Sequence, residues 1–286
     1  MIEQGRFALN RSVYPRLNIE GFFELAARLG IHKVELRNDH PAGILDRLSP
    51  QEVRSLATKN GLQIITINAL QNFNNASQLP ELLSELKELL QVAAAIKGEA
   101  IILCPSHSRP DPRSRELIFQ ETVGALKVFR PYFEESRVLG YLEPIGLTDC
   151  SLRSLVDAMN AIRESGGTCY KIVFDTFHHF TGPDTAATVE KEYDVSYTGL
   201  VHVSGVTSHA SPDQYTDDAR VMLSPEDRIG NVEKVALLEK LGYCGNISFE
   251  PFSREVHELD VRGIEEAIRR SISIIQNITD HPAPKK

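Results

Sequence analysis

Four short apolar runs in the second half of the chain end at, or carry near their end, a side chain that can bind a metal ion or move a proton. These side chains are Glu143, Asp175, His202 and Glu250. Three carboxylates brought into one place would repel one another and raise one another's pKa unless a cation compensated them. A set of three carboxylates and one imidazole suits Mn²⁺ or Zn²⁺, and also Co²⁺ or Mg²⁺. If the fold gathers the four runs, the pattern predicts a site for one divalent metal ion.

Taken one at a time, these residues have a plainer interpretation. A carboxylate after an apolar run commonly caps the next helix or faces solvent in a loop. Pro144 and Pro251 directly follow the two glutamates, and a proline there removes a backbone donor and ends a strand where a ligand would stand. The metal hypothesis therefore rests on all four residues taken together, and it requires a fold that brings the four strand ends into one place.

Short β-rich runs alternate with amphipathic helical stretches along the chain, which is the pattern of a parallel α/β fold. Eight such units in 286 residues average about 36 residues each, which matches the size of one βα unit. A single (β/α)₈ TIM barrel over residues 1–277 is the economical solution, with a flexible C-terminal tail at 278–286. An open doubly wound sheet is the competitor, but the GxGxxG turn that often accompanies it is absent from the sequence. The predicted strands span 6–9, 33–36, 63–68, 100–103, 138–143, 170–174, 199–203 and 246–250, and the predicted helices about 19–29, 50–60, 80–96, 114–133, 152–165, 184–193, 231–241 and 260–277.

In such a barrel the active site forms at the C-terminal ends of the strands, so the four candidate ligands would share one mouth. Glu35, Asn68 and His107 end or follow the second, third and fourth predicted strands. We expect them to contact substrate hydroxyls at the same mouth, although loop or helix-capping roles are equally open.

Composition and charge narrow the classes of partner. The formal net charge is −8 and the pI is about 5.6, which disfavours nucleic acid and anionic membranes as partners. The four cysteines form no CxxC pair and are expected to be free thiols in a reducing compartment. The sequence shows no signal-peptide pattern and no run of about 18 apolar residues, so a cytoplasmic location is expected. A homo-oligomer remains an open possibility.

The strand ends, together with the D-x-x-H element at 175–178, resemble the xylose-isomerase-like TIM-barrel superfamily of sugar isomerases and epimerases. Further segments are similar to those of the 2-keto-myo-inositol (inosose) isomerases within it. These segments are Phe7-Ala8-Leu9-Asn10, Val34-Glu35-Leu36-Arg37, Asn68-Ala69-Leu70-Gln71-Asn72-Phe73-Asn74-Asn75 and Ile172-Val173-Phe174-Asp175. The resemblance extends over about residues 5–277, and the string at 68–75 is its most specific part.

The resemblance implies a metal site and two residues that face the substrate. The implied metal ligands are Glu143, Asp175, His202 and Glu250, and the implied substrate-facing residues are His178 and Arg220. The chain departs from the family pattern after the seventh strand. Val203-Ser204-Gly205 follows the histidine where relatives often carry acidic residues, and no tryptophan follows Arg220. These departures concentrate in a loop that would border the substrate.

The residues and the resemblance together favour a metal-dependent isomerase or epimerase that acts on a small keto-polyol through a cis-enediolate. The resemblance implies 2-keto-myo-inositol as the first candidate and inositol catabolism as the context. Glu143 and Glu250, on separate strands, are expected to act as acid and base besides binding the metal. Loss of water on the same site, as in a dehydratase, is one alternative, and a non-catalytic sugar-binding barrel is another. Phosphodiester hydrolysis of the endonuclease IV kind would need more strand-end histidines and a basic groove. No glycine-rich phosphate cradle follows the seventh or eighth strand, which favours an unphosphorylated substrate.

Overall fold

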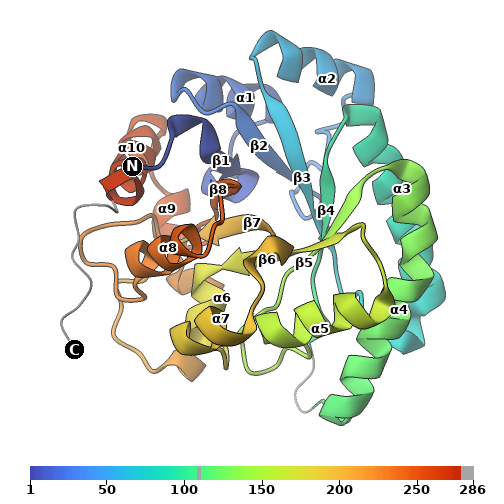
Figure 1. Cartoon of the computed structure of the whole chain (residues 1–286). Coiled ribbons are helices and arrows are strands. Elements are labelled where there is room, and N and C mark those ends of the chain that lie inside the picture. Colours follow the sequence, from blue (N-terminus) through green and yellow to red (C-terminus); the bar gives the residue numbers. More distant parts are fainter. Residues whose placement is uncertain (108–110, 278–286) are drawn as a thin grey trace.

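The computed structural model describes residues 1–107 and 111–277 of the chain. Its eight strands form one closed barrel in chain order, and each strand runs parallel to both of its neighbours (Figure 1). The first and last strands pair with each other and so close the ring. The predicted TIM-barrel fold is therefore confirmed. The strands are β1 (Phe7–Asn10), β2 (Lys33–Arg37), β3 (Gln63–Leu70), β4 (Ala100–Leu103), β5 (Leu139–Leu142), β6 (Tyr170–Asp175), β7 (Thr198–Val203) and β8 (Asn246–Phe249).

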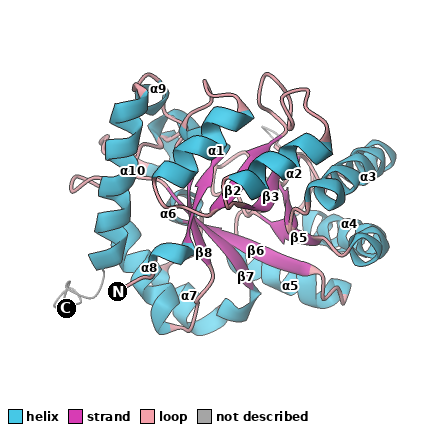
Figure 2. Ribbon diagram, turned by 90° about the horizontal axis from the view of Figure 1, so that it is seen from above, coloured by secondary structure: helices cyan, strands magenta, loops and turns pink. Residues whose placement is uncertain are grey.

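Helices surround the strands on the outside, as the view from above shows (Figure 2). The connections after β6 and β8 each contain a short helix before a longer one. The helices of the described part of the chain are α1 (Ile19–Arg28), α2 (Pro50–Lys59), α3 (Leu79–Ile96), α4 (Arg115–Ser136), α5 (Leu155–Ser165), α6 (Thr176–Thr181), α7 (Ala186–Glu192), α8 (Asn231–Lys240), α9 (Arg254–His257) and α10 (Val261–Gln276).

Strand residues alternate between two apolar environments, because successive side chains point to opposite faces of a strand. Leu9 and Ile101 belong to a large cluster that the strands share with the helices, whereas Ala8 and Ile102 belong to a smaller one. The smaller cluster fills the interior of the barrel. A residue two positions beyond such an interior residue also points inward, closer to the C-terminal mouth. Polar side chains at that spacing are therefore aimed into the mouth.

Capping residues fix several helix ends. Ser49 caps α2 and forms a capping box with Glu52, and Pro50 occupies the first turn. The first helix ends just before Gly30, whose φ of +68° lies in the left-handed region that glycine adopts without steric cost.

The structure differs from the sequence prediction at several boundaries. β3 continues to Leu70, two residues beyond its predicted end, because Leu70 still pairs with Leu103 of β4. α5 begins at Leu155 rather than at 152, because Ser154 is its N-cap. The prediction missed α6 and α9, which are 6 and 4 residues long and too short to show a helical period. The predicted tail at 278–286 lies outside the described residues.

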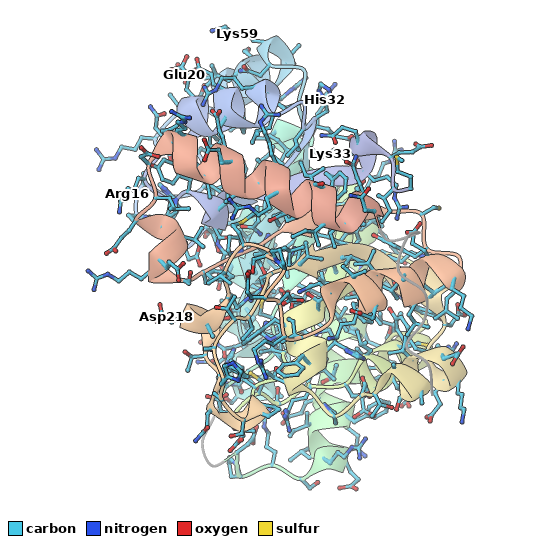
Figure 3. The ribbon with its side chains drawn as sticks, turned by 90° about the vertical axis from the view of Figure 1, so that its left-hand side faces the viewer. Arg16, Glu20, His32, Lys33, Lys59 and Asp218 are labelled. Carbon is cyan, nitrogen blue, oxygen red and sulfur yellow. The ribbon has the colours of Figure 1, made fainter. Side chains whose placement is uncertain are left out.

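The last helix, α10, lies across the outer surface of the barrel on the side shown in Figure 3. Its isoleucines at 264, 268, 272 and 275 are buried against the barrel. Glu20, Lys59 and Asp218 lie at the outline of the same view and are exposed. Among residues 1–107 and 111–277, no helix is both long enough and apolar enough to cross a membrane.

Candidate metal centre

The C-terminal ends of β5 to β8 bring the four predicted ligands together. Each side chain lies two positions beyond a barrel-interior residue of the same strand, as Glu143 follows Tyr141 and His202 follows Leu200. The four side chains are buried, and one ligand atom from each lies within 4.8 Å of the others. The four are Glu143, Asp175, His202 and Glu250.

Nδ1 of His202 is the nitrogen that faces the carboxylates. It lies 3.0 Å from Oε1 of Glu143, 3.1 Å from Oε2 of Glu250 and 4.0 Å from Oδ2 of Asp175. A divalent ion with bonds of about 2.0–2.2 Å to nitrogen and oxygen needs its ligands at about these separations. Distances and donor types therefore fit one small divalent cation.

A fourth carboxylate, Glu35, holds the other side of the imidazole. Nε2 of His202 lies 3.1 Å from both carboxylate oxygens of Glu35, and Thr66, Asn68 and Ser248 donate hydrogen bonds to the same carboxylate. A carboxylate that accepts the Nε2 proton leaves the lone pair on Nδ1 for a metal ion and fixes the orientation of the ring. The arrangement is that of a histidine ligand with its supporting carboxylate.

The carboxylates also set the charge of the site. Burial alone lowers the pKa of His202, but Glu250, Glu35 and Glu143 outweigh it and raise that pKa well above its ordinary value. Burial raises the pKa of Glu143, and its attraction to His202 offsets only part of this effect. The site therefore favours a positive charge beside Nδ1, which a proton or a metal ion can supply.

Two arginines bind Glu250, each through a different carboxylate oxygen. Nη2 of Arg220 lies 2.8 Å from Oε2 of Glu250 and 2.6 Å from Oδ2 of Asp175. Nη1 of Arg37 lies 2.9 Å from Oε1 of Glu250. Both guanidinium groups stack over the ring of Phe252, at 4.7 Å and 4.8 Å from its centroid. Burial raises the pKa of Glu250, but His202 and the two arginines outweigh burial and hold that pKa below its ordinary range.

A cavity of about 210 Å³ opens above these groups at the barrel mouth. Polar side chains on several sides of it can hydrogen-bond to a polyol. Six of the predicted site residues line it: Asn68, His107, Glu143, His178, Arg220 and Glu250.

His178 reaches the cavity from the first turn of α6. Oδ1 of Asp175 accepts hydrogen bonds from the backbone N–H groups of Phe177 and His178, at 2.7 Å and 2.9 Å, and so caps this helix. Oδ2 of Asp175 faces Arg220. The helix-cap and metal-ligand interpretations of Asp175 are therefore compatible, because each uses a different oxygen. Nε2 of His178 lies 3.4 Å from Nη1 of Arg220.

Arg220 is only 2 % exposed, although it belongs to the loop after β7 that departs from the family pattern. Gly205 and Val221 form an isolated antiparallel bridge that folds this loop back over the barrel. Nε of Arg220 donates to Ser204 Oγ at 3.1 Å. The loop therefore places Arg220 inside the mouth and not on the outer surface.

Glu35 lies deep in the site, whereas His107 lies at its exposed rim. The structure places Glu35, which we expected at substrate hydroxyls, fully buried beneath His202, where its oxygens are taken up by protein donors. Glu35 is therefore positioned to orient the imidazole of His202, a candidate metal ligand. Asn68 both donates to Glu35 and lines the cavity. His107 is exposed at the rim.

Arg37, Asn10 and Cys104 also contact the site, although none of them was predicted from the sequence to belong to it. Nδ2 of Asn10 donates to Oε1 of Glu250 at 2.9 Å, beside the contact from Arg37. Cys104 Sγ lies 3.9 Å from Oε2 of Glu143 and lines the cavity. The spacing carried a signal: each lies two positions beyond an inward-facing strand residue, as Arg37 follows Glu35.

A family model and several solved structures relate the chain to known proteins. The chain matches the family model described as xylose isomerase-like TIM barrel over residues 23–278. A xylose isomerase domain containing protein from Salmonella typhimurium LT2 has 38% sequence identity and a TM-score of 0.91, over 96% of this chain and 99% of that one. No curated protein matches the chain in sequence.

Two more distant structures have the same fold. The IolI protein, solved with a zinc atom, has 19% identity and a TM-score of 0.88, over 96% of this chain and 99% of that one. D-psicose 3-epimerase from Clostridium cellulolyticum H10, solved with D-tagatose, has 15% identity and a TM-score of 0.76, also over 96% and 99%. At these identities the likeness concerns the fold alone. The family model, by contrast, matches most of the chain, so the chain belongs to the xylose isomerase-like TIM barrel family.

Proposed function

We propose that this chain is a divalent-metal-dependent isomerase or epimerase of a small keto-polyol. One observation carries the proposal: Glu143 and Glu250, from β5 and β8, line the same cavity and each presents one oxygen to Nδ1 of His202. Two carboxylates on different strands can meet a substrate from two directions. A binding protein would not need such a pair beside one imidazole.

A divalent ion held by these four side chains would polarise a substrate carbonyl and make the adjacent C–H acidic. Glu143 or Glu250 then removes that proton, and the other glutamate returns a proton at the neighbouring carbon. Arg220 and His178 border the cavity and supply N–H donors for substrate oxygens.

The comparisons and the sequence support this reaction class and a first substrate. The names of similar structures include D-psicose 3-epimerase and 3-keto-D-glucoside 4-epimerase, each of which acts on a sugar. The resemblance of the 68–75 string to inosose isomerases makes 2-keto-myo-inositol the first substrate to test. Mn²⁺ and Zn²⁺ are the first metals to test, because the ligand set mixes oxygen and nitrogen.

The test is proton NMR in D₂O of the protein loaded with Mn²⁺ or Zn²⁺. Mn²⁺ broadens proton signals, so its samples are read after chelation and removal of protein. The substrates are inosose and a panel of ketohexoses. We expect metal-dependent deuterium incorporation beside the carbonyl and the appearance of a new keto-inositol, both abolished by EDTA and by Glu143→Gln. Glu20→Gln, on the outer surface, is the matched control and should behave as the wild type.

Other outcomes would change or end the proposal. Exchange with a ketohexose alone would keep the reaction and change the substrate. Loss of water from the substrate would identify a dehydratase on the same site. No exchange with any substrate in any metal form would contradict the isomerase proposal and leave a sugar-binding barrel to test.

A further inference from the structure

A second group of potential metal ligands lies at the rim of the barrel mouth. His107, from the loop after β4, and Asp149 and Cys150, from the loop after β5, place one ligand atom each within 4.8 Å of one another. Sγ of Cys150 lies 3.0 Å from Nδ1 of His107 and 4.0 Å from Oδ1 of Asp149. The group shares no residue with the metal centre described above.

The backbone fixes this group in place. His107 and Cys150 form an isolated antiparallel bridge, and the N–H of Ser151 donates to the carbonyl of Ser106 at 2.9 Å. The side chain of Asn74 accepts from the Ser106 N–H at 2.9 Å and donates to Ser151 Oγ at 3.0 Å. The two loops are therefore tied to each other and to the loop after β3. Ligands on such a support are held close together before any ion arrives.

We propose that His107, Asp149 and Cys150 form a second metal-binding site, which takes Zn²⁺ or a similar thiolate-binding divalent ion. Tetrahedral zinc with bonds of about 2.3 Å to sulfur and 2.0–2.1 Å to nitrogen separates those two ligands by about 3.5 Å. The sulfur lies 3.0 Å and 3.8 Å from the two nitrogens of His107, so small side-chain rotations reach this value. A thiolate and a carboxylate neutralise the charge of the ion.

The donor set distinguishes this site from the deeper one. The deeper ligands are three carboxylates and one imidazole, whereas the rim site includes sulfur, which favours zinc over manganese or magnesium. Three protein ligands leave at least one position of a tetrahedral ion open. Because His107 also lines the cavity, the proposed site borders that cavity.

Two measurements test the proposal on the purified, metal-stripped protein, without reference to activity. Titration with Zn²⁺ should show two equivalents bound per chain for the wild type and one for Cys150→Ser or His107→Asn. Titration with Co²⁺ should produce a sulfur-to-cobalt charge-transfer band in the wild type, because a thiolate enters the coordination sphere. His107 is exposed, so His107→Asn remains informative if Cys150→Ser fails to fold.

Two further variants separate the rim site from the deeper one. Cys104 is the thiol beside Glu143, so Cys104→Ser should keep both the band and the second equivalent. Asp175→Asn should bind one equivalent and keep the band, even if the proposed reaction proves wrong. A single equivalent without a sulfur band in the wild type would overturn the proposal. So would two equivalents in His107→Asn, or a band that Cys104→Ser abolishes.

Discussion

The first four and the last four strands of the barrel contribute different chemistry to one metal centre. β5 to β8 supply the candidate ligands, whereas β1 and β2 supply the side chains that hold those ligands. Glu35 contacts Nε2 of His202, and Asn10 and Arg37 both donate hydrogen bonds to Oε1 of Glu250. In the proposed metal centre, the second half of the barrel would supply the ligands, and side chains of β1 and β2 would orient His202 and set the charge around Glu250.

The largest effect is expected from a change in β6. Asp175→Asn keeps an oxygen to cap α6 but removes the negative charge from the ligand set. We expect its metal affinity to fall by more than the roughly 10- to 100-fold that loss of a supporting group causes, with activity falling in parallel. Metal content and initial rates measure this effect. Unchanged circular dichroism would show that the helix cap and the fold survive.

A change in the first half of the barrel should weaken metal binding less than Asp175→Asn does. Glu35→Gln removes the charge that holds Nε2 of His202, and we expect about a 10- to 100-fold loss of metal affinity with activity restored by excess metal. Thr66→Val removes only one hydrogen bond to Glu35 and is the matched control, with a smaller effect. A loss for Glu35→Gln as large as that for Asp175→Asn would break the distinction between the two halves.

Arg37 should affect the rate rather than the metal content. Arg37→Met removes a charged hydrogen bond to Glu250, a contribution of about 1.5 kcal/mol, so we expect kcat/KM to fall about tenfold. Asp39→Asn alters the opposite side of the same guanidinium and should change kcat/KM little, since Arg37 still reaches Glu250. Loss of bound metal in Arg37→Met would assign Arg37 to metal binding instead.

The smallest effect concerns His179, which points away from the cavity and stacks on Phe174 at 5.0 Å between ring centroids. Burial lowers the pKa of His179 from 6.5 to about 4. Between these pH values the unfolded chain binds a proton that the folded chain does not, so this residue makes stability fall as pH falls from 6.5 to 4. His179→Phe should flatten that dependence in denaturant melts and leave kcat/KM unchanged. Equal pH dependence in both proteins would contradict the assignment.

The sequence pointed to the side chains that gather at the mouth more fully than to the side chains that hold them. Four successive strand ends carry a carboxylate or a histidine, and the alternation of β and α segments predicts that these side chains share one mouth. The sequence led us to expect Glu35 at substrate hydroxyls, whereas the structure places it against Nε2 of His202, because a strand end shows that a side chain points inward but not how deep it lies. α6 was missed because six residues cannot display a helical period. The contacts of Arg37 with Glu250 depend on the closure of β1 and β2 onto β8, which no local pattern encodes.

In the proposed metal centre, Nδ1 of His202 and the carboxylates of Glu143, Asp175 and Glu250 hold one divalent ion while Glu35 holds Nε2. Anomalous X-ray diffraction from crystals grown with Mn²⁺ or Zn²⁺ tests it directly. We expect an anomalous peak within bonding distance of Nδ1 and of oxygens from Glu143, Asp175 and Glu250. An ion bonded through Nε2, or no peak at these residues in crystals of protein that binds the metal in solution, would contradict the account.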